Sequence, residues 1–182
     1  MPFIFRDAEH IERVMQGPIG EEFRDLYQEQ GFRVLGYVNY GARHLLAKEA
    51  LERPEEVAGR SIRVIQSPLH TQLWESLGAQ PTPIPIPEVY NALQVGLVDM
   101  MDLTQSAAVG FRLHEVVPYF VETGHIWALG ILFLAEDFYQ SLTPEQQEVF
   151  LEIGAEAAAH FNALMAQDHA RSMAQAEAAG AT

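Results

Sequence analysis

Cysteine is absent from the 182-residue sequence, and lysine occurs only once, at Lys48. The lack of cysteine excludes disulfides and thiolate metal sites, although it does not fix the compartment. The chain has 11 basic and 25 acidic residues, a net charge of −14, and no basic patch that would suit nucleic acid. No apolar run approaches the ~20 residues of a membrane-spanning helix, and the first residues do not resemble a signal peptide.

The common enzyme motifs are missing as well. The sequence contains no G-x-S-x-G elbow, Walker loop, G-x-G-x-x-G fingerprint or H-E-x-x-H pair, and its seven histidines form no zinc-like cluster. Asp99 and Asp102 are three residues apart, which on a strand places them on opposite faces and argues against a catalytic pair. We therefore expect no enzyme, no metal and no cofactor, with a promiscuous hydrolase as a minor alternative.

Strand and helix signals alternate between Ser61 and Asp102. A β-rich run at 61–65 precedes a helix opened by Ser67-Pro68, and an extended, proline-rich run at 82–86 precedes a helix starting at Pro87. A third strand is expected from Leu97. This alternation predicts an α/β fold with a parallel sheet, whose ligands bind beyond the carboxyl ends of the strands. The first helix is expected to bury an apolar stripe of Leu69, Leu73, Trp74 and Leu77.

The flanking sequence predicts further helices and strands. Two helices at 6–16 and 19–30 are separated by Gly17-Pro18. A long helix begins near Pro144, with Thr143 as N-cap and Gln146 completing a capping box. The remaining predicted elements are strands at 32–39 and 42–47, a short helix at 104–111, β-rich runs at 116–122 and 126–135 joined at Thr123-Gly124, and a short helix at 136–141.

Three segments occur in an order and spacing that resemble the substrate-binding proteins of TRAP transporters, the DctP-like family. They are GRSIRVIQSP, LGAQPTPIPIPEVYNALQVGLVD and LTPEQQEVFLEIGAEAA. The resemblance implies a periplasmic-binding-protein type II-like fold, in which two α/β lobes close over a small organic acid. It implies four parts: 1–40 as a remnant of the first lobe, 41–128 as the ligand-binding second lobe, 129–142 as the return to the first lobe, and 143–182 as a long C-terminal helix spanning both lobes.

The resemblance also suggests ligand-binding residues. Arg63 stands where a family arginine pairs with the ligand carboxylate; from alternation alone it could equally face solvent or an ion pair. Arg43, in NYGAR, stands close to a second family arginine, and the alternative is an ion pair with Glu49, Glu52 or Asp102. The other candidate ligand-binding residues are Trp127, Asp102, Leu103 and Tyr90. His125 is expected to be either a core residue or part of the pocket.

Two departures from the family pattern affect these expectations. The segment MMDLTQ replaces a polar family segment, with Leu103 where asparagine is common, which suggests a more apolar pocket. The sequence also begins after the family's first half-lobe, so a truncated chain is expected. Partners would be an organic acid and the TRAP membrane subunits, and localisation would be periplasmic. A self-associating homo-oligomer without ligand is the main alternative, since helices at 6–16 and 19–30 would lack a sheet to cover.

Overall fold

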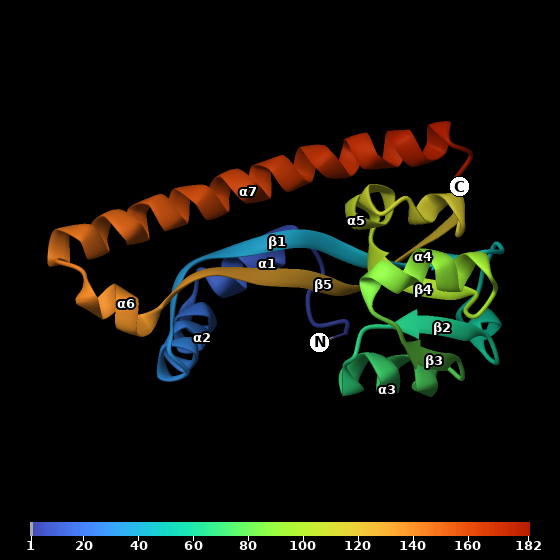
Figure 1. The fold of residues 1–182 in the computed structure, drawn as a ribbon, viewed down its shortest axis with the longest axis horizontal. Coiled ribbons are helices and arrows are strands. Elements are labelled where there is room, and N and C mark those ends of the chain that lie inside the picture. The colour runs from blue at the N-terminus through green and yellow to red at the C-terminus, as the bar shows by residue number, and fades with distance from the viewer. Residues whose placement is uncertain (1) are drawn as a thin grey trace. The chain divides into compact units, whose positions relative to one another are not determined.

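The computed structural model describes residues 2–182, which form two compact units. The first unit contains Ala42–Ile126 and Asp168–Thr182, with Phe3 attached to it. The second unit contains Ile4–Gly41 and Trp127–Gln167. Two long strands and one long helix contribute residues to both units (Figure 1).

A five-stranded sheet has the strand order β3-β2-β4-β1-β5. The strands are β1 (Phe32–Ala47), β2 (Ser61–Val64), β3 (Gln80–Pro83), β4 (Met100–Thr104) and β5 (Tyr119–Ala135). Strand β2 runs parallel to both β3 and β4, whereas β1 pairs antiparallel with β4. The expected α/β class with a parallel-rich sheet and flanking helices is confirmed. Pro81 and Pro83 lie on β3 at the edge of the sheet, where a missing N–H blocks further pairing.

Short helices follow the strands of the first unit (Figure 1). They are η1 (Pro54–Val57), α3 (Pro68–Ser76), α4 (Ile86–Gln94), α5 (Gln105–Gly110) and η2 (Leu113–Glu115). Pro68 and Pro87 lie in the first turns of α3 and α4, where the missing N–H costs nothing. Gly78 and Gly96 follow the ends of these helices with φ values of 79° and 78°, which glycine adopts without strain.

Both faces of the sheet in the first unit are covered by apolar side chains. Met101 is buried in one hydrophobic cluster with Leu46, Val89 and Leu93, and the preceding residue, Met100, is buried in another. Consecutive strand residues point to opposite faces, so the two clusters lie on the two sides of the sheet. A parallel sheet covered on both faces is the usual arrangement.

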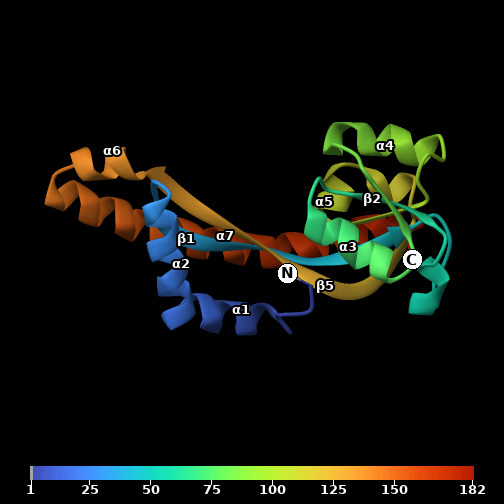
Figure 2. The same ribbon diagram turned by 90° about the horizontal axis from the view of Figure 1, so that it is seen from below.

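The second unit contains α1 (Ala8–Met15), α2 (Pro18–Glu29) and α6 (Glu136–Ser141). Helices α1 and α2 meet at an angle at the predicted Gly17-Pro18 break (Figure 2). At the start of α1, the Asp7 side chain accepts a hydrogen bond from the backbone N–H of His10 at 2.7 Å. These observations confirm the two predicted N-terminal helices.

Helix α7 (Pro144–Ala178) begins with the predicted capping box. The Thr143 N–H donates to Gln146 Oε1 at 2.9 Å, and the Gln146 N–H donates to Thr143 Oγ1 at 3.3 Å. In the second unit α7 packs closely on β1: a Cβ added to Gly36 would lie 2.5 Å from the Cβ of Ala158. Nowhere in residues 2–182 is there a helix with the length and hydropathy needed to cross a membrane.

Several expected boundaries were wrong. The strands predicted at 32–39 and 42–47 are one strand, β1, and the runs at 116–122 and 126–135 belong to one strand, β5. The third strand of the motif starts at Met100 rather than Leu97. The expected stripe of α3 was also wrong, because Leu69 and Leu77 are exposed while His70 is buried beside Trp74.

Candidate functional site

The centre of the sheet brings charged side chains together inside the first unit. Arg43 lies on β1, Arg63 on β2 and Asp102 on β4, and β4 lies between the other two strands. The three side chains are buried. Because burying a charge is costly unless it is paired, this arrangement requires a specific set of contacts. Arg63 alternates with Ile62 and Val64, which belong to the same hydrophobic cluster as Met100, so its side chain points to the opposite face of the sheet from Asp102. We call Asp102, Arg43, His70 and His125 the Asp102 cluster.

Asp102 and Arg43 form a buried ion pair. Arg43 Nε donates to Asp102 Oδ2 at 2.7 Å, and Arg43 Nη2 donates to the main-chain carbonyl of Asp102 at 2.6 Å. The Asp102 side chain has no exposed surface. Burial alone would raise the pKa of Asp102, but the hydrogen bond to His125 and the Arg43 charge outweigh it and hold this pKa well below its usual range. Asp102 is therefore a fixed negative charge.

His125 connects the ion pair to the rest of β5. Its Nε2 lies 3.3 Å from Asp102 Oδ2, and its Nδ1 lies 2.7 Å from the hydroxyl of Thr123. A carboxylate only accepts hydrogen bonds, so Nε2 carries the proton that faces Asp102. The Thr123 oxygen also accepts the N–H of Leu45 at 3.2 Å. Both ring nitrogens of His125 are thus engaged within the first unit.

His70 reaches the same carboxylate from the first turn of α3. Its Nδ1 lies 3.7 Å from Asp102 Oδ2 and has no hydrogen-bond partner among the described residues. Burial lowers the pKa of His70, and the attraction of Asp102 offsets this only in part. The sequence analysis missed His70. Its spacing of four residues from Trp74, on the same helix face, was the available signal.

Arg63 carries a buried charge that its surroundings leave uncompensated. Its Nε donates to the carbonyl of Ile84 at 2.8 Å, whereas its buried Nη1 has no partner among residues 2–182. Burial and the nearby Arg43 lower the pKa of Arg63, and Asp102 opposes this without contacting it. An arginine side chain remains charged at neutral pH despite such a shift. The Nη1 group of Arg63 can therefore donate a hydrogen bond to an anion.

The other predicted residues lie in different surroundings. Leu103 and Tyr90 are partly buried and pack against the hydrophobic cluster around Met101, and the Tyr90 hydroxyl donates to Glu115 at 3.0 Å. Trp127 belongs to the second unit, where its indole nitrogen is buried without a described partner. Asp99 lies apart from Asp102 and accepts a hydrogen bond from Ser61 at 2.7 Å. The structure thus joins Arg43 and Asp102 from the predicted set, whereas Arg63, on the neighbouring strand, bonds the Ile84 carbonyl instead.

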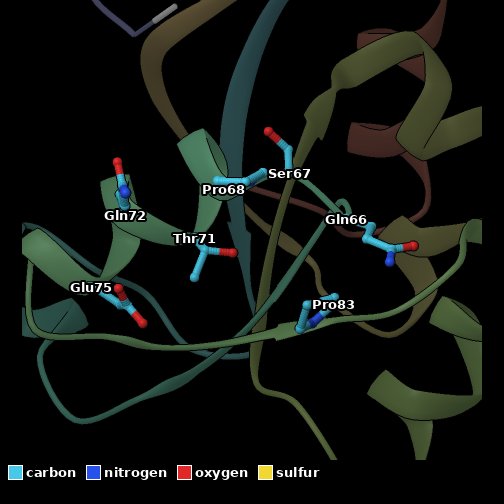
Figure 3. A pocket seen from close by; sticks show the side chains of 7 residues that line it. All are labelled: Gln66, Ser67, Pro68, Thr71, Gln72, Glu75 and Pro83. Carbon is cyan, nitrogen blue, oxygen red and sulfur yellow. The ribbon is translucent and has the colours of Figure 1, made fainter.

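A surface groove lies along α3 beside the end of β3 (Figure 3). Thr71, Gln72 and Glu75 line it from α3, and Pro83 lines it from β3. Glu75 is the charged residue of this lining, and its negative charge would repel an organic acid. Within residues 2–182 no group of three metal-ligating side chains is placed to hold an ion. Arg63, whose Nη1 has no partner within the same residues, is therefore the better candidate for an anion contact.

Family comparison agrees with this fold. The family profile described as "Bacterial extracellular solute-binding protein, family 7" (DctP) matches residues 1–182. The chain belongs to this family. A TRAP periplasmic solute-binding protein from Sulfitobacter sp. NAS-14.1, solved with bound β-D-galacturonate, is 28% identical with a TM-score of 0.96. The match covers 100% of this chain and 61% of that one.

Two further DctP relatives illustrate the range of ligands. A TRAP periplasmic solute-binding protein from Chromohalobacter salexigens, solved with D-glucuronate, is 28% identical with a TM-score of 0.96, over 100% of this chain and 60% of that one. The ectoine-binding periplasmic protein TeaA of Halomonas elongata is 33% identical over 131 residues, which are 72% of this chain and 38% of TeaA. These relatives are periplasmic binding proteins rather than enzymes. The chain spans about half the length of the curated relatives it matches.

Proposed function

We propose that this chain forms the acid-binding part of a TRAP-type solute-binding protein and binds a small organic acid without covalent chemistry. Arg63 is the carboxylate clamp in this proposal. The observation that carries it is the buried Nη1 of Arg63, which has no partner among the described residues. A guanidinium suits the role because its planar fork can make two hydrogen bonds to one carboxylate.

Arg43 has a different role in the same proposal. Two of its nitrogens are committed to Asp102, which was one of the two alternatives expected from the sequence. We assign it to holding Asp102 in place beside the acid, while a direct contact of Arg43 or Trp127 with the ligand remains a prediction. Uronates are the first candidate ligands, because the relatives from Sulfitobacter and Chromohalobacter are solved with galacturonate and glucuronate. Periplasmic localisation and transfer of the acid to TRAP membrane subunits complete the proposal.

Replacing Arg63 tests the clamp. We expect Arg63→Met to weaken binding of D-galacturonate or D-glucuronate by about 2–5 kcal/mol in isothermal titration calorimetry, as is typical when one partner of a charged pair is lost. Arg63→Lys should also weaken binding, because an ammonium cannot replace the fork. Among residues 2–182 no ion pair holds the Arg63 charge, so the apolar replacement removes a buried charge at the cost of one hydrogen bond to the Ile84 carbonyl, and we expect the chain to stay folded.

Arg60→Met is the matched control, since Arg60 precedes the same strand but pairs with Glu49 near the surface at 2.9 Å. It should leave the affinity unchanged. Equal affinity of Arg63→Met and the unmodified chain, with circular dichroism showing that both are folded, would overturn the clamp.

A further inference from the structure

The chain passes between its two units at four places. The crossings lie between Phe3 and Ile4, between Gly41 and Ala42 on β1, between Ile126 and Trp127 on β5, and between Gln167 and Asp168 on α7. Two members of the Asp102 cluster lie within two residues of a crossing, Arg43 on β1 and His125 on β5. The Phe3 N–H donates to the main-chain carbonyl of His125 at 2.8 Å. Three of the four crossings therefore adjoin this cluster.

One buried carboxylate anchors these three crossings inside the first unit. Asp102 Oδ2 accepts from Arg43 Nε at 2.7 Å and lies 3.3 Å from His125 Nε2, so it holds β1 and β5 at once. His125 in turn holds Phe3 through its main chain. The Asp102 side chain lies on β4 with no exposed surface, and a buried charge cannot lose its partner without a large penalty. These attachments are therefore firm.

Each of the three crossings also carries a residue with a positive φ value. The values are 58° for Phe3, 94° for Gly41 and 53° for Gly124, which lies two residues before Ile126. A positive φ is strained for phenylalanine, and such residues cluster at functional sites and switch regions. A Cβ added to Gly41 or Gly124 would meet nothing within 4 Å, so the backbone conformation, rather than space, requires glycine there. Hinges consist of a few residues that absorb large φ and ψ changes.

Side chains replace part of the main-chain ladder between β1 and β5 beside these glycines. The Leu45 N–H donates to the Thr123 hydroxyl at 3.2 Å, and the Gly124 N–H donates to His44 Nδ1 at 3.2 Å. In a regular sheet both groups would donate to main-chain carbonyl oxygens. A ladder that is interrupted in this way lets a strand bend, as a β-bulge does.

We propose that these three crossings form a hinge, in which Phe3, Gly41 and Gly124 flex and Asp102 is the positioning residue that fixes the hinge to the first unit. With Asp102 in place, motion is confined to the flexing residues. Without it, the parts of β1 and β5 inside the first unit become mobile as well, and the two units sample a wider range of relative orientations. The hinge requires no ligand, so it is tested on the free chain and stands apart from the Arg63 clamp.

Spin labels can report this motion, because the sequence has no cysteine and labels attach only at introduced ones. Asp25→Cys on α2 and Gln94→Cys on α4 place one label at an exposed position of each unit. Double electron–electron resonance should give a broader distance distribution in Asp102→Asn than in the unmodified background. Glu136→Gln is the control, because it removes a charged pair inside the second unit, and it should leave the width unchanged.

Thr123→Val is a milder way to loosen the anchor, at an exposed position. It removes the hydroxyl that lies 2.7 Å from His125 Nδ1 and accepts the Leu45 N–H. The distribution should broaden here too, and the Leu45 amide should exchange hydrogen about tenfold faster, the value of one neutral hydrogen bond.

The flexing residues are tested by restricting their φ angles. Gly41→Ala and Gly124→Ala should shift or narrow the distance distribution, because alanine adopts a positive φ only under strain. Gly59→Ala is the matched control, since Gly59 has a φ of 77°, nothing lies within 4 Å of its added Cβ, and it lies within the first unit away from the crossings.

Circular dichroism identifies the folded variants, and the labels are compared in these. An unchanged width in Thr123→Val, or in a folded Asp102→Asn, overturns the anchor. Equal distributions for Gly41→Ala, Gly124→Ala and Gly59→Ala overturn the flexing residues. Broadening in Glu136→Gln as large as in Thr123→Val would mean general loosening of the chain, and it overturns the hinge as a whole.

Discussion

The two units of this chain are stabilised in different ways. The first unit contains the hydrophobic clusters found among the described residues, and it surrounds a buried ion pair with them. The second unit relies on close backbone packing and on the partly exposed pair of Arg33 and Glu136, whose Nη2 and Oε1 atoms are 2.6 Å apart. A hydrogen bond between charged groups is electrostatically stronger in the low dielectric of such a core than at the surface.

The exposed surfaces of the units differ as well. Large apolar side chains of the second unit remain exposed, among them Ile19, Phe23, Leu26, Phe133, Phe138, Val149 and Ile153. Exposed apolar surface of this kind is typical of a face that packs against something else. Self-association of the chain stays a prediction. Val95, Leu97 and Phe111 of the first unit are exposed as well, so the units differ chiefly in that the buried ion pair of Arg43 and Asp102 lies in the first.

Removing the charge of Asp102 should have the largest effect. We expect Asp102→Asn to destabilise the first unit by about 3–5 kcal/mol, because Arg43 would remain buried without a negative partner. Urea unfolding can follow each unit separately, since Trp74 belongs to the first unit and Trp127 to the second. Fluorescence in a Trp127→Phe background would report the first unit, and a Trp74→Phe background the second.

The matched substitution in the second unit is Glu136→Gln, which removes the partly exposed partner of Arg33. It should cost less than about 1 kcal/mol. A loss as large as that of Asp102→Asn would show that the two units do not differ in how they use charge.

Overpacking the second unit should have an intermediate effect. In Gly36→Ala the new Cβ would lie 2.5 Å from the Cβ of Ala158 and 3.2 Å from the carbonyl oxygen of Gly154. Neither atom belongs to a flexible side chain, so α7 must shift, at a cost of about 1–3 kcal/mol. Gly110→Ala is the control, because nothing lies within 4 Å of its added Cβ. Urea unfolding followed at Trp127 measures Gly36→Ala, and unfolding followed at Trp74 measures the control in the first unit. An unchanged midpoint in Gly36→Ala would contradict close packing of α7 on β1.

Local chemistry made the helix boundaries predictable from the sequence. Thr143 and Gln146 form the expected reciprocal cap, and Gly17-Pro18 separates α1 from α2. These signals depend on neighbouring residues alone. The strand boundaries were less predictable. Gly41 and Gly124 have φ values of 94° and 53°, yet β1 and β5 continue through them, because pairing with distant strands overrides a local turn signal.

The candidate site was only partly visible in the sequence. Arg63 and Arg43 were found through the family resemblance. The pairing of Arg43 with Asp102 joins residues 59 apart, and Asp102 was one of three acidic partners considered beside a ligand role. His70 was missed, because a search for apolar periodicity treats buried polar residues as exposed ones. Its burial depends on which strands are neighbours, and that is a property of the fold rather than of the local sequence.

Histidine protonation should produce the smallest effect, and it again concerns the first unit. Burial lowers the pKa of His70 below its ordinary value of 6.5. The charges of Arg43 and His125 also lower this pKa, whereas the attraction of Asp102 raises it. Burial likewise lowers the pKa of His44, with Glu122 opposing it. Below about pH 6.5 the unfolded chain therefore binds more protons than the folded chain, so stability falls as the pH decreases.

Urea midpoints of the first unit between pH 7.5 and 5 should show this slope, and His70→Asn should reduce it while His44 supplies the remainder. His160→Asn, at an exposed position of the second unit, is the matched control. The lowered pKa of Asp102 also stabilises the folded chain, and this stability is lost only at more acidic pH, where the carboxylate becomes protonated. The second unit, followed at Trp127, should respond less over this range, because its charged pair of Arg33 and Glu136 contains no histidine. An unaltered slope in His70→Asn would mean that His70 accepts its proton in the folded chain as readily as in the unfolded one.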